Sequence, residues 1–219
     1  MTDRALASDF AHVDTWVFDL DNTLYSPQAR LFDQIEARMR GFISRRFGYS
    51  LGQADALRET YWREHGTTLA GLMANHDVDP MEFLHDVHDI DFSKLSAAPH
   101  LAARIAALPG RKIVYTNGDR KYAARVLAAR GLSAPFEAIY GIEDAGFVPK
   151  PKEAAFAAVF GKDGLTGQRA AMFEDDPRNL EVPEALGLRT VLVHTKTGPQ
   201  SHIHHRTTDL ARFLSQITG

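Results

Sequence analysis

Short apolar runs recur along the chain, and segments with helical spacing separate them. The runs cover residues 15–20, 112–116, 137–141, 170–174 and 189–194. Short runs rich in β-branched residues that alternate with helical segments are typical of a parallel sheet with helices on both faces. The pattern therefore predicts an α/β fold.

Three helices of this alternation carry recognisable end signals. They are predicted over residues 120–131, 151–161 and 177–187, and each stretch closes on a glycine. Asp119 stands at the N-cap position of the first helix and Asp176 at that of the third. Pro151 occupies the first turn of the second helix, where its missing N–H costs nothing.

A long insertion separates the first apolar run from the second. About 90 residues lie between Leu20 and Lys112, far more than one crossover helix requires. Apolar residues follow helical spacing over 27–48 and again over 51–61, and a capping box at 79–82 starts another helix. We therefore expect residues 26–97 to form a helical cap, and residues 1–25 and 98–219 to form the core.

The composition of the chain limits the kinds of molecule that the protein would bind. The 219-residue chain is 44% hydrophobic and 24% charged, as in ordinary globular proteins. Its net charge of -3 offers no basic surface for a nucleic acid polymer or an anionic membrane. The chain has no cysteine, and its first residues hold no apolar stretch that would serve as a signal peptide. We expect a cytoplasmic protein with a small-molecule ligand.

Polar side chains follow the predicted strands at their carboxyl ends. They are Asp19 and Asp21 after the first run, Thr116, Asn117 and Gly118 after the second, Lys150 after the third, and Glu174, Asp175 and Asp176 after the fourth. Ligands of open parallel sheets bind outside these ends, so the segments are expected to converge. The carboxylates would suit Mg²⁺, and Thr116 with the amides near Asn117 and Gly118 would hold phosphate oxygens.

The order of these segments resembles the four motifs of the haloacid dehalogenase superfamily of hydrolases. DLDNT, TNG, KP and EDDPRN follow one another along the chain, and the surrounding stretches FDLDNTLY, TNGDR, FVPKP and MFEDDPRNL are similar to the pyrimidine 5'-nucleotidase group. Each motif alone is weak evidence for the family, whereas four motifs in the family's order are specific evidence. The resemblance implies a Rossmann-like parallel-sheet core with a helical cap inserted just after the first motif.

The resemblance also implies a role for each core residue. Asp19 would attack phosphorus and form an aspartyl-phosphate, and Asp21 would protonate the leaving alkoxide and then deprotonate the attacking water. Mg²⁺ would be held by Asp19, Asp175 and the backbone carbonyl of Asp21. Lys150 would offset the remaining negative charge, and Thr116 would hydrogen-bond the transferring phosphoryl group.

Alternatives remain within the third and fourth motifs. Lys150 is preferred to the lysine two positions later, which would fall in the first helical turn. Asp176 precedes a proline and suits an N-cap, which leaves Asp175 as the metal ligand, Glu174 in a supporting role and Asn179 to orient Asp175 or a metal-bound water. The family often has serine or an apolar residue where Asp176 stands, so the choice between the two aspartates stays open.

Cap residues are candidates for recognising the leaving group. Tyr61 and Trp62 would either stack a base or pack the helical bundle. Further candidate contacts are Tyr25, Arg63, His65, Thr67 and Thr68. Three histidines near the carboxyl terminus, at positions 202, 204 and 205, are interpreted as a solvated loop, because no carboxylate or cysteine accompanies them at the spacing of a metal site.

The sequence predicts an Mg²⁺-dependent phosphatase for small phosphate monoesters, and the resemblance favours pyrimidine nucleoside monophosphates. A phosphosugar mutase, or a phosphatase for pyridoxal 5'-phosphate or phosphoglycolate, stays open because the same motifs would serve it. A carbon–halogen hydrolase is disfavoured because it has no alkoxide for Asp21 to protonate. A receiver-like signalling module is disfavoured because its acidic pair precedes its phosphorylated aspartate, the reverse of the order here.

Overall fold

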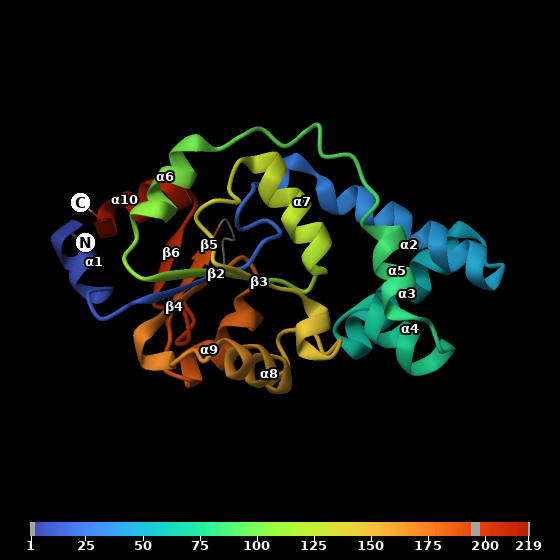
Figure 1. The fold of residues 1–219 in the computed structure, drawn as a ribbon. Helices are drawn as coiled ribbons and strands as arrows, with labels where there is room; N and C mark the ends of the chain where they lie inside the picture. The colour runs from blue at the N-terminus through green and yellow to red at the C-terminus, as the bar shows by residue number, and fades with distance from the viewer. Residues whose placement is uncertain (1–2, 194–197, 219) are drawn as a thin grey trace.

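One parallel sheet forms the centre of the protein in the computed structural model, which describes residues 3–193 and 198–218 (Figure 1). Its strands run in the order β3-β2-β1-β4-β5-β6, and each is parallel to its neighbours. They are β1 (Thr15–Phe18), β2 (Arg111–Tyr115), β3 (Ala138–Tyr140), β4 (Ala170–Glu174), β5 (Arg189–Val193) and β6 (His205–Thr207). The predicted α/β fold is confirmed.

Five of these strands overlap the predicted apolar runs, and the edge strand β6 was not predicted. Its residues, His205–Thr207, are all polar and only partly buried or exposed, so they form no apolar run. The fifth predicted run extends to residue 194, which lies outside the described residues.

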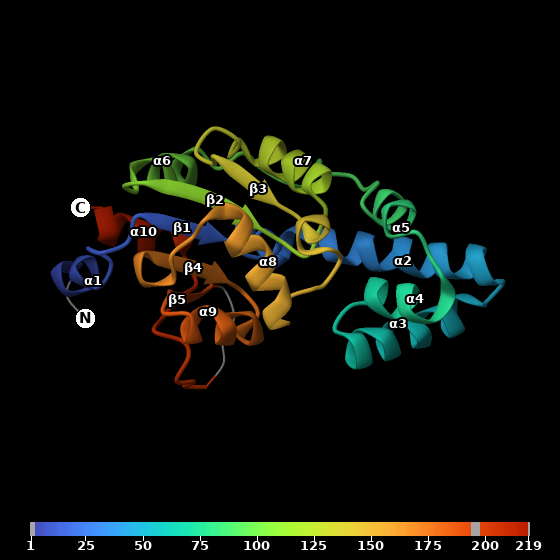
Figure 2. The same cartoon turned by 60° about the horizontal axis from the view of Figure 1, so that its bottom comes forward.

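Helices cover both faces of the sheet (Figures 1 and 2). One face carries α1 (Asp3–Asp9), α6 (Pro99–Ala107), α7 (Arg120–Arg130) and α10 (Leu210–Thr218). The other carries α8 (Glu153–Asp163) and α9 (Glu181–Ala185). Within residues 3–193 and 198–218, no helix has both the length and the apolar composition that crossing a bilayer needs.

The central strand β1 contributes side chains to both apolar layers. Trp16 and Phe18 point to the layer under α6, α7 and α10, whereas Val17 points to the layer over α8. Phe18 stacks on Phe173 of the neighbouring strand, with ring centroids 4.6 Å apart. Because β1, β2 and β4 are parallel neighbours, the residues that follow them all lie at one edge of the sheet.

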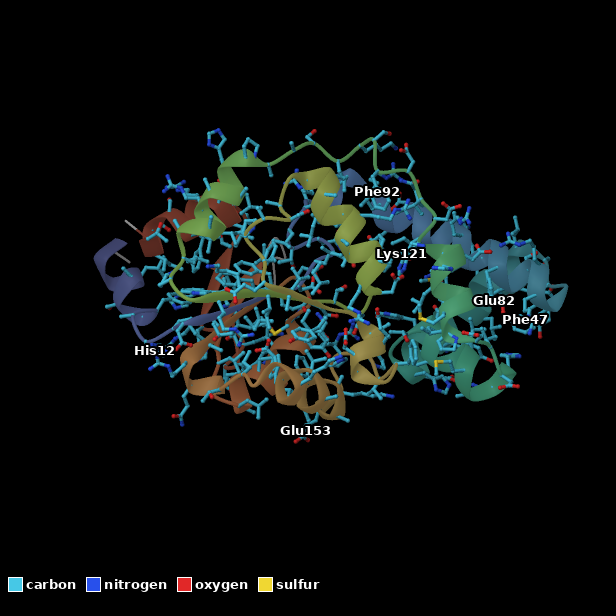
Figure 3. The ribbon with its side chains drawn as sticks, viewed as in Figure 1. His12, Phe47, Glu82, Phe92, Lys121 and Glu153 are labelled. Atoms are coloured by element: carbon cyan, nitrogen blue, oxygen red, sulfur yellow. The ribbon has the colours of Figure 1, made fainter. Side chains whose placement is uncertain are left out.

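Four helices between β1 and β2 lie together beyond this edge of the sheet, at the right of Figures 1 and 2. They are α2 (Leu31–Phe47), α3 (Leu51–His65), α4 (Thr68–His76) and α5 (Pro80–Val87), and we call residues 31–87 the helical insert. Side chains fill the space between its helices (Figure 3). The helices predicted over 27–48 and 51–61 and from 79 correspond to α2, α3 and α5, while α4 was not predicted.

Helix ends follow the sequence signals in some places and depart from them in others. The first predicted helix corresponds to α7, with Asp119 as its N-cap and Gly131 as its C-cap. Helix α8 continues past the expected stop at Gly161 and ends where Gly164 adopts a left-handed conformation. The stretch after Asp176 forms a 3-10 turn, Pro177–Leu180, before α9 begins, and Pro183 has no N–H with which to continue that turn as an α-helix.

Candidate active site

A pocket of about 270 Å³ lies where the carboxyl edge of the sheet faces the helical insert. The core side contributes Asp19, Asp21, Asn22, Thr116, Asn117, Gly118, Lys150, Glu174, Asp175, Asp176, Arg178 and Asn179. The insert side contributes mostly apolar side chains, among them Phe32, Ile35, Met39, Trp62, Leu69, Phe83, Leu84 and Val87. The four predicted segments therefore converge on one pocket.

A buried ammonium group joins two of these segments. Lys150 Nζ donates to Asp19 Oδ1 at 2.8 Å, to Glu174 Oε2 at 2.7 Å and to the backbone oxygen of Tyr115 at 3.2 Å. Burial lowers the pKa of Lys150, but the charges of Asp19 and Glu174 outweigh burial and hold that pKa above its ordinary value. Lys152, the alternative, is exposed at the start of α8.

Three carboxylates surround the floor of the pocket. Asp19, Glu174 and Asp175 each offer an oxygen, and these atoms lie within 4.8 Å of one another. Burial, reinforced by the charge of Glu174, raises the pKa of Asp19 to about 8 and that of Asp175 to about 9. One ammonium group does not balance three carboxylates, and the donors are all oxygen, so the site suits a hard divalent cation such as Mg²⁺.

Glu174 also shapes the loop that presents Asp175. Its Oε1 atom accepts hydrogen bonds from the backbone N–H groups of Asp175 and Asp176, at 3.1 and 3.2 Å. Asp176 in turn accepts from the N–H of Arg178 at 3.0 Å and caps the 3-10 turn, as predicted. Asn179, also predicted here, is buried at the pocket wall.

Asp21 is held by two tyrosine hydroxyls. Its Oδ1 atom accepts hydrogen bonds from the hydroxyls of Tyr25 at 2.5 Å and Tyr122 at 2.6 Å. Thr116 Oγ1 lies 3.5 Å from its Oδ2 atom. Tyr25, which we expected to contact substrate, is buried and does not belong to the pocket lining of the described chain. Its hydroxyl contacts Asp21 instead.

Asn117 and Gly118 line the pocket, and the Asn117 side chain and the Gly118 N–H have partners within the protein. The Asn117 side chain accepts from the Lys150 N–H at 2.8 Å and donates to the Lys150 carbonyl at 3.2 Å. The Gly118 N–H donates to Thr116 Oγ1 at 3.0 Å. A Cβ atom at position 118 would lie 2.9 Å from Cδ1 of Tyr122, so glycine is required for this close approach. Asn117 thus fixes the backbone that carries Lys150, a role that the sequence did not reveal.

The insert residues proposed from the sequence divide into two groups. Trp62, Thr67 and Thr68 line the pocket. The other three, Tyr61, Arg63 and His65, do not line the pocket of the described chain. Tyr61 is buried inside the insert, where its hydroxyl lies 2.7 Å from His76 Nε2. Neighbouring residues of a helix point about 100° apart, so Tyr61 and Trp62 point in different directions.

Arg178 is a pocket residue that the sequence analysis did not single out. Its guanidinium lies 5.2 Å from the ring centroid of Trp62, and its side chain is ion-paired with Asp176 at 2.6 Å. The contact joins the core to the insert at the pocket. Its position two residues after Asp176 in the fourth motif was the available signal.

The carboxyl-terminal histidines do not line the pocket, and the expected solvated loop holds only in part: His202 and His204 lie in the loop before β6, where His204 is exposed and His202 is partly buried. His202 Nε2 contacts the backbone oxygen of Pro177 at 3.0 Å, and His204 Nδ1 lies 2.8 Å from Thr190 Oγ1. His205 belongs to β6 and is partly buried. These contacts connect the loop before β6 to β5 and to the 3-10 turn at Pro177–Leu180. In the described chain, the group of side chains with metal-ligand spacing is the acidic cluster of the pocket.

Comparisons with known proteins agree with this architecture. Phosphate metabolism protein 8 of Saccharomyces cerevisiae is 25% identical over 176 residues, which cover 73% of this chain and 54% of that protein. The chain thus spans about half the length of this curated relative. A HAD phosphatase from Thermococcus onnurineus shares the fold at 16% identity and a TM-score of 0.65, over 93% of this chain and 97% of that one.

A dehalogenase is among the similar structures as well. The 2-haloacid dehalogenase from Pseudomonas syringae pv. Tomato DC3000 is 18% identical, with a TM-score of 0.60 over 94% of this chain and 98% of that one. Residues 13–187 of this chain match the family model of the haloacid dehalogenase-like hydrolases. The match covers most of the chain and all four segments around the pocket. The protein therefore belongs to the haloacid dehalogenase-like hydrolase family.

Proposed function

We propose that the protein is an Mg²⁺-dependent phosphatase that hydrolyses small phosphate monoesters, with pyrimidine nucleoside 5'-monophosphates as its preferred class. The observation that carries the proposal is the pairing of two carboxylates at the end of β1. Asp19 accepts a hydrogen bond from the buried Lys150 ammonium group, whereas Asp21 accepts hydrogen bonds from two tyrosine hydroxyls. Two carboxylates in such different surroundings suit two different roles.

Asp19 is the nucleophile in this proposal. One of its oxygens forms a bond to phosphorus while the bond from phosphorus to the leaving oxygen breaks, and Asp21 gives its proton to that oxygen. Asp21 then takes a proton from the water that attacks the aspartyl-phosphate, which releases phosphate and restores Asp19. Lys150 would keep Asp19 in place and offset negative charge, and Thr116, which lines the pocket, would hydrogen-bond the phosphoryl group.

Asp19 and Asp175, with the backbone carbonyl of Asp21, would hold the Mg²⁺ ion, and the bound ion would neutralise charge between nucleophile and substrate. Glu174 and Asn179 would support these ligands. The excess of carboxylates over ammonium groups around the pocket supports this assignment.

Dehalogenase structures are similar to the chain in fold, but Asp21 favours phosphate-ester chemistry. A carboxylic acid beside the nucleophile is useful when the leaving group is an alkoxide that must be protonated. A halide ion leaves without a proton. The name of the yeast relative, which refers to phosphate metabolism, is in keeping with a phosphate-containing substrate.

The insert supports a leaving group that contains a ring. Trp62 is 52% exposed and lines the pocket opposite Arg178, so an aromatic face and a cation are both available there. We propose that residues 26–97 act as a cap over a core made of residues 1–25 and 98–219. We also place the enzyme in the cytoplasm, in keeping with a chain that lacks cysteine.

Phosphate release from a panel of esters tests the proposal. The panel contains UMP, CMP, dTMP, AMP, pyridoxal 5'-phosphate and phosphoglycolate, each with Mg²⁺ and with EDTA. The expected result is Mg²⁺-dependent release that is fastest with the pyrimidine nucleotides. Fastest release from another ester would reassign the substrate, and conversion of a hexose 1-phosphate to its isomer without phosphate release would identify a mutase.

Asp19→Asn tests the nucleophile. The amide keeps the size of the side chain but cannot form the aspartyl-phosphate, so turnover is expected to be lost while the circular dichroism spectrum is unchanged. Phosphate release at wild-type rate from a folded Asp19→Asn protein would contradict the mechanism.

A further inference from the structure

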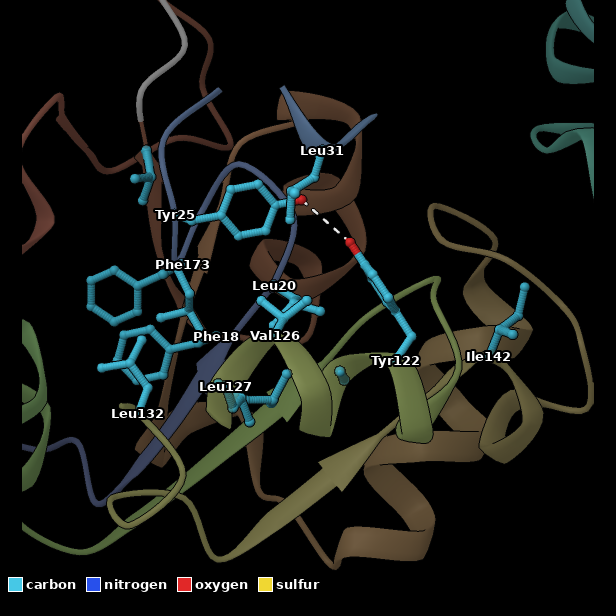
Figure 4. Close-up of a cluster of buried hydrophobic side chains, with 14 of the residues drawn as sticks. Phe18, Leu20, Tyr25, Leu31, Tyr122, Val126, Leu127, Leu132, Ile142 and Phe173 are labelled. Atoms are coloured by element: carbon cyan, nitrogen blue, oxygen red, sulfur yellow. Dashed lines mark hydrogen bonds between the residues drawn. The ribbon is translucent and has the colours of Figure 1, made fainter. Parts of the chain in front are cut away.

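Two tyrosine hydroxyls from separate elements meet on one oxygen of Asp21. Tyr25 lies in the loop after β1 and Tyr122 in the first turn of α7, and both donate to Asp21 Oδ1, at 2.5 and 2.6 Å. The two hydroxyl oxygens lie 3.5 Å apart (Figure 4). Neither tyrosine belongs to the lining of the candidate active-site pocket, so neither is placed to touch substrate there, although Tyr122 borders a second pocket beside α5.

Both hydroxyls keep their protons and act only as donors toward Asp21. The ordinary pKa of a tyrosine hydroxyl is about 10, so each hydroxyl holds its proton at neutral pH and can donate a hydrogen bond to the carboxylate. Their rings lie among apolar side chains such as Leu20 and Leu31 (Figure 4). A side chain packed in this way has few rotamers available, so the hydroxyls form a fixed pair.

Tyr122 is itself held at its ring and along its backbone. Its ring stacks on His88 with centroids 4.1 Å apart and an interplanar angle of 14°, and the backbone of Gly118 approaches it closely. Asp119 accepts from the Tyr122 N–H at 2.8 Å and pairs with His88 Nδ1 at 2.6 Å. The position of the hydroxyl is therefore set by several independent contacts.

The two donors distinguish the two oxygens of Asp21. With Oδ1 accepting two hydrogen bonds, the proton that Asp21 delivers is left to Oδ2, the oxygen beside the pocket residue Thr116. We infer that Tyr25 and Tyr122 are positioning residues that fix Asp21 with its proton-bearing oxygen toward the leaving group. The inference rests on the proposed function, because it assumes that Asp21 is the general acid.

The test uses two esters of similar size that differ in their need for an acid. Benzyl phosphate releases an alkoxide, which needs a proton, whereas 4-nitrophenyl phosphate releases a stabilised phenolate, which does not. Because kcat/KM covers the steps up to cleavage of the ester, we expect Tyr122→Phe to lower kcat/KM about tenfold or more for benzyl phosphate, and much less for 4-nitrophenyl phosphate. Tyr25→Phe is expected to act in the same direction.

A matched control removes a tyrosine hydroxyl elsewhere. Tyr140 donates to Asp163 at 2.9 Å, away from the pocket, so Tyr140→Phe is expected to leave both kcat/KM values unchanged. Asp21→Asn provides the reference and is expected to show the strongest selective loss on benzyl phosphate. Each variant is checked by circular dichroism and thermal unfolding.

The outcomes separate the inference from the function on which it rests. A selective loss in Tyr122→Phe, in the direction of the loss in Asp21→Asn, supports the positioning role. An equal loss on both esters in Tyr122→Phe, or no loss, overturns the positioning role. If Asp21→Asn shows a selective loss in that case, the proposed function still stands. Absence of phosphate release by the wild-type protein, or an unselective Asp21→Asn variant, overturns the proposed mechanism itself.

Discussion

At the scale of single residues, the pocket is dominated by an imbalance of charge. Lys150 is fully buried and bonded to Asp19 and Glu174, and Asp175 adds a third carboxylate. Each further buried negative charge costs free energy unless a cation accompanies it. The raised pKa values of Asp19 and Asp175, about 8 and about 9, express this cost. A divalent cation would remove it.

Asp175→Asn tests the metal site without measuring activity. Mg²⁺ that binds only the folded protein stabilises it by about 2.7 kcal/mol at 100 times its dissociation constant, which corresponds to about 5 °C or more in Tm for a domain of this size. We expect Mg²⁺ to raise the Tm of the wild-type protein relative to EDTA by this order. The increase should be lost in Asp175→Asn.

Asp176→Asn is the matched control for this measurement. Asparagine caps helical turns about as well as aspartate, so the variant should keep both its fold and the Mg²⁺-dependent increase in Tm. Loss of the increase in Asp176→Asn, with its retention in Asp175→Asn, would transfer the ligand role to Asp176.

At the scale of elements, the same helix presents one aromatic residue to the pocket and the next to its own core. Trp62 of α3 lines the pocket beside Arg178, whereas Tyr61 is buried against α4. A Cβ atom at Gly71 of α4 would lie 2.2 Å from Cγ of Tyr61, which shows how closely the two helices approach. The proposed substrate contact and the packing of the insert thus fall to adjacent residues.

Trp62→Ala and Tyr61→Phe are expected to behave differently. Trp62→Ala should lower kcat/KM for UMP by about tenfold, because stacking is lost. It should change kcat/KM less for 4-nitrophenyl phosphate, whose ring is attached directly to the phosphate and so reaches less far toward the insert. Tyr61→Phe should leave both values unchanged and lower the free energy of unfolding by about 1 kcal/mol, because the hydrogen bond to His76 is lost. Equal losses on both esters in Trp62→Ala would indicate packing alone.

The sequence predicted elements better than it predicted the contacts between them. Apolar runs and caps located β1, β4 and α7, because burial and end signals act locally. Helical spacing over 51–61 placed Tyr61 among the apolar positions of α3, and Tyr61 is buried, but the spacing gave no sign that the adjacent Trp62 lines the pocket. The strand β6 was missed because polar edge strands lack an apolar run. Tyr122 was missed because its partner, Asp21, is 101 residues away in the chain.

At the scale of the whole molecule, α7 fastens the helical insert to the core. His88, directly after α5, stacks on Tyr122 and bonds to Asp119, and its carbonyl accepts from Arg125 at 3.1 Å. Lys121 Nζ also lies 3.3 Å from His85 Nε2 of α5. The element that positions Asp21 is therefore the one that holds the insert, so displacement of the insert at His88 would also disturb Tyr122.

Asp119→Asn tests this connection through its dependence on pH. Burial raises the pKa of Asp119, but hydrogen bonds from His88 and from the Tyr122 N–H lower it more, so the pKa lies below the ordinary value of 3.8. A carboxyl group whose pKa is lower in the folded state stabilises the protein above its unfolded-state pKa, and this stabilisation is lost as pH falls through the folded-state pKa. Since asparagine keeps the N-cap, the variant should lose only the charged hydrogen bond to His88. Its free energy of unfolding at pH 7 should therefore be about 2 kcal/mol lower than that of the wild-type protein. Urea unfolding of both proteins at pH 7, 5, 4 and 3 should show this difference shrinking below about pH 4.

Asp209→Asn is the control, because Asp209 is an exposed aspartate that accepts a hydrogen bond from the Arg212 N–H before α10. This variant should change the free energy of unfolding little at any of these pH values. A difference between wild type and Asp119→Asn that is absent at pH 7, or equally large at pH 3, would mean that the pair does not hold the insert through its charge.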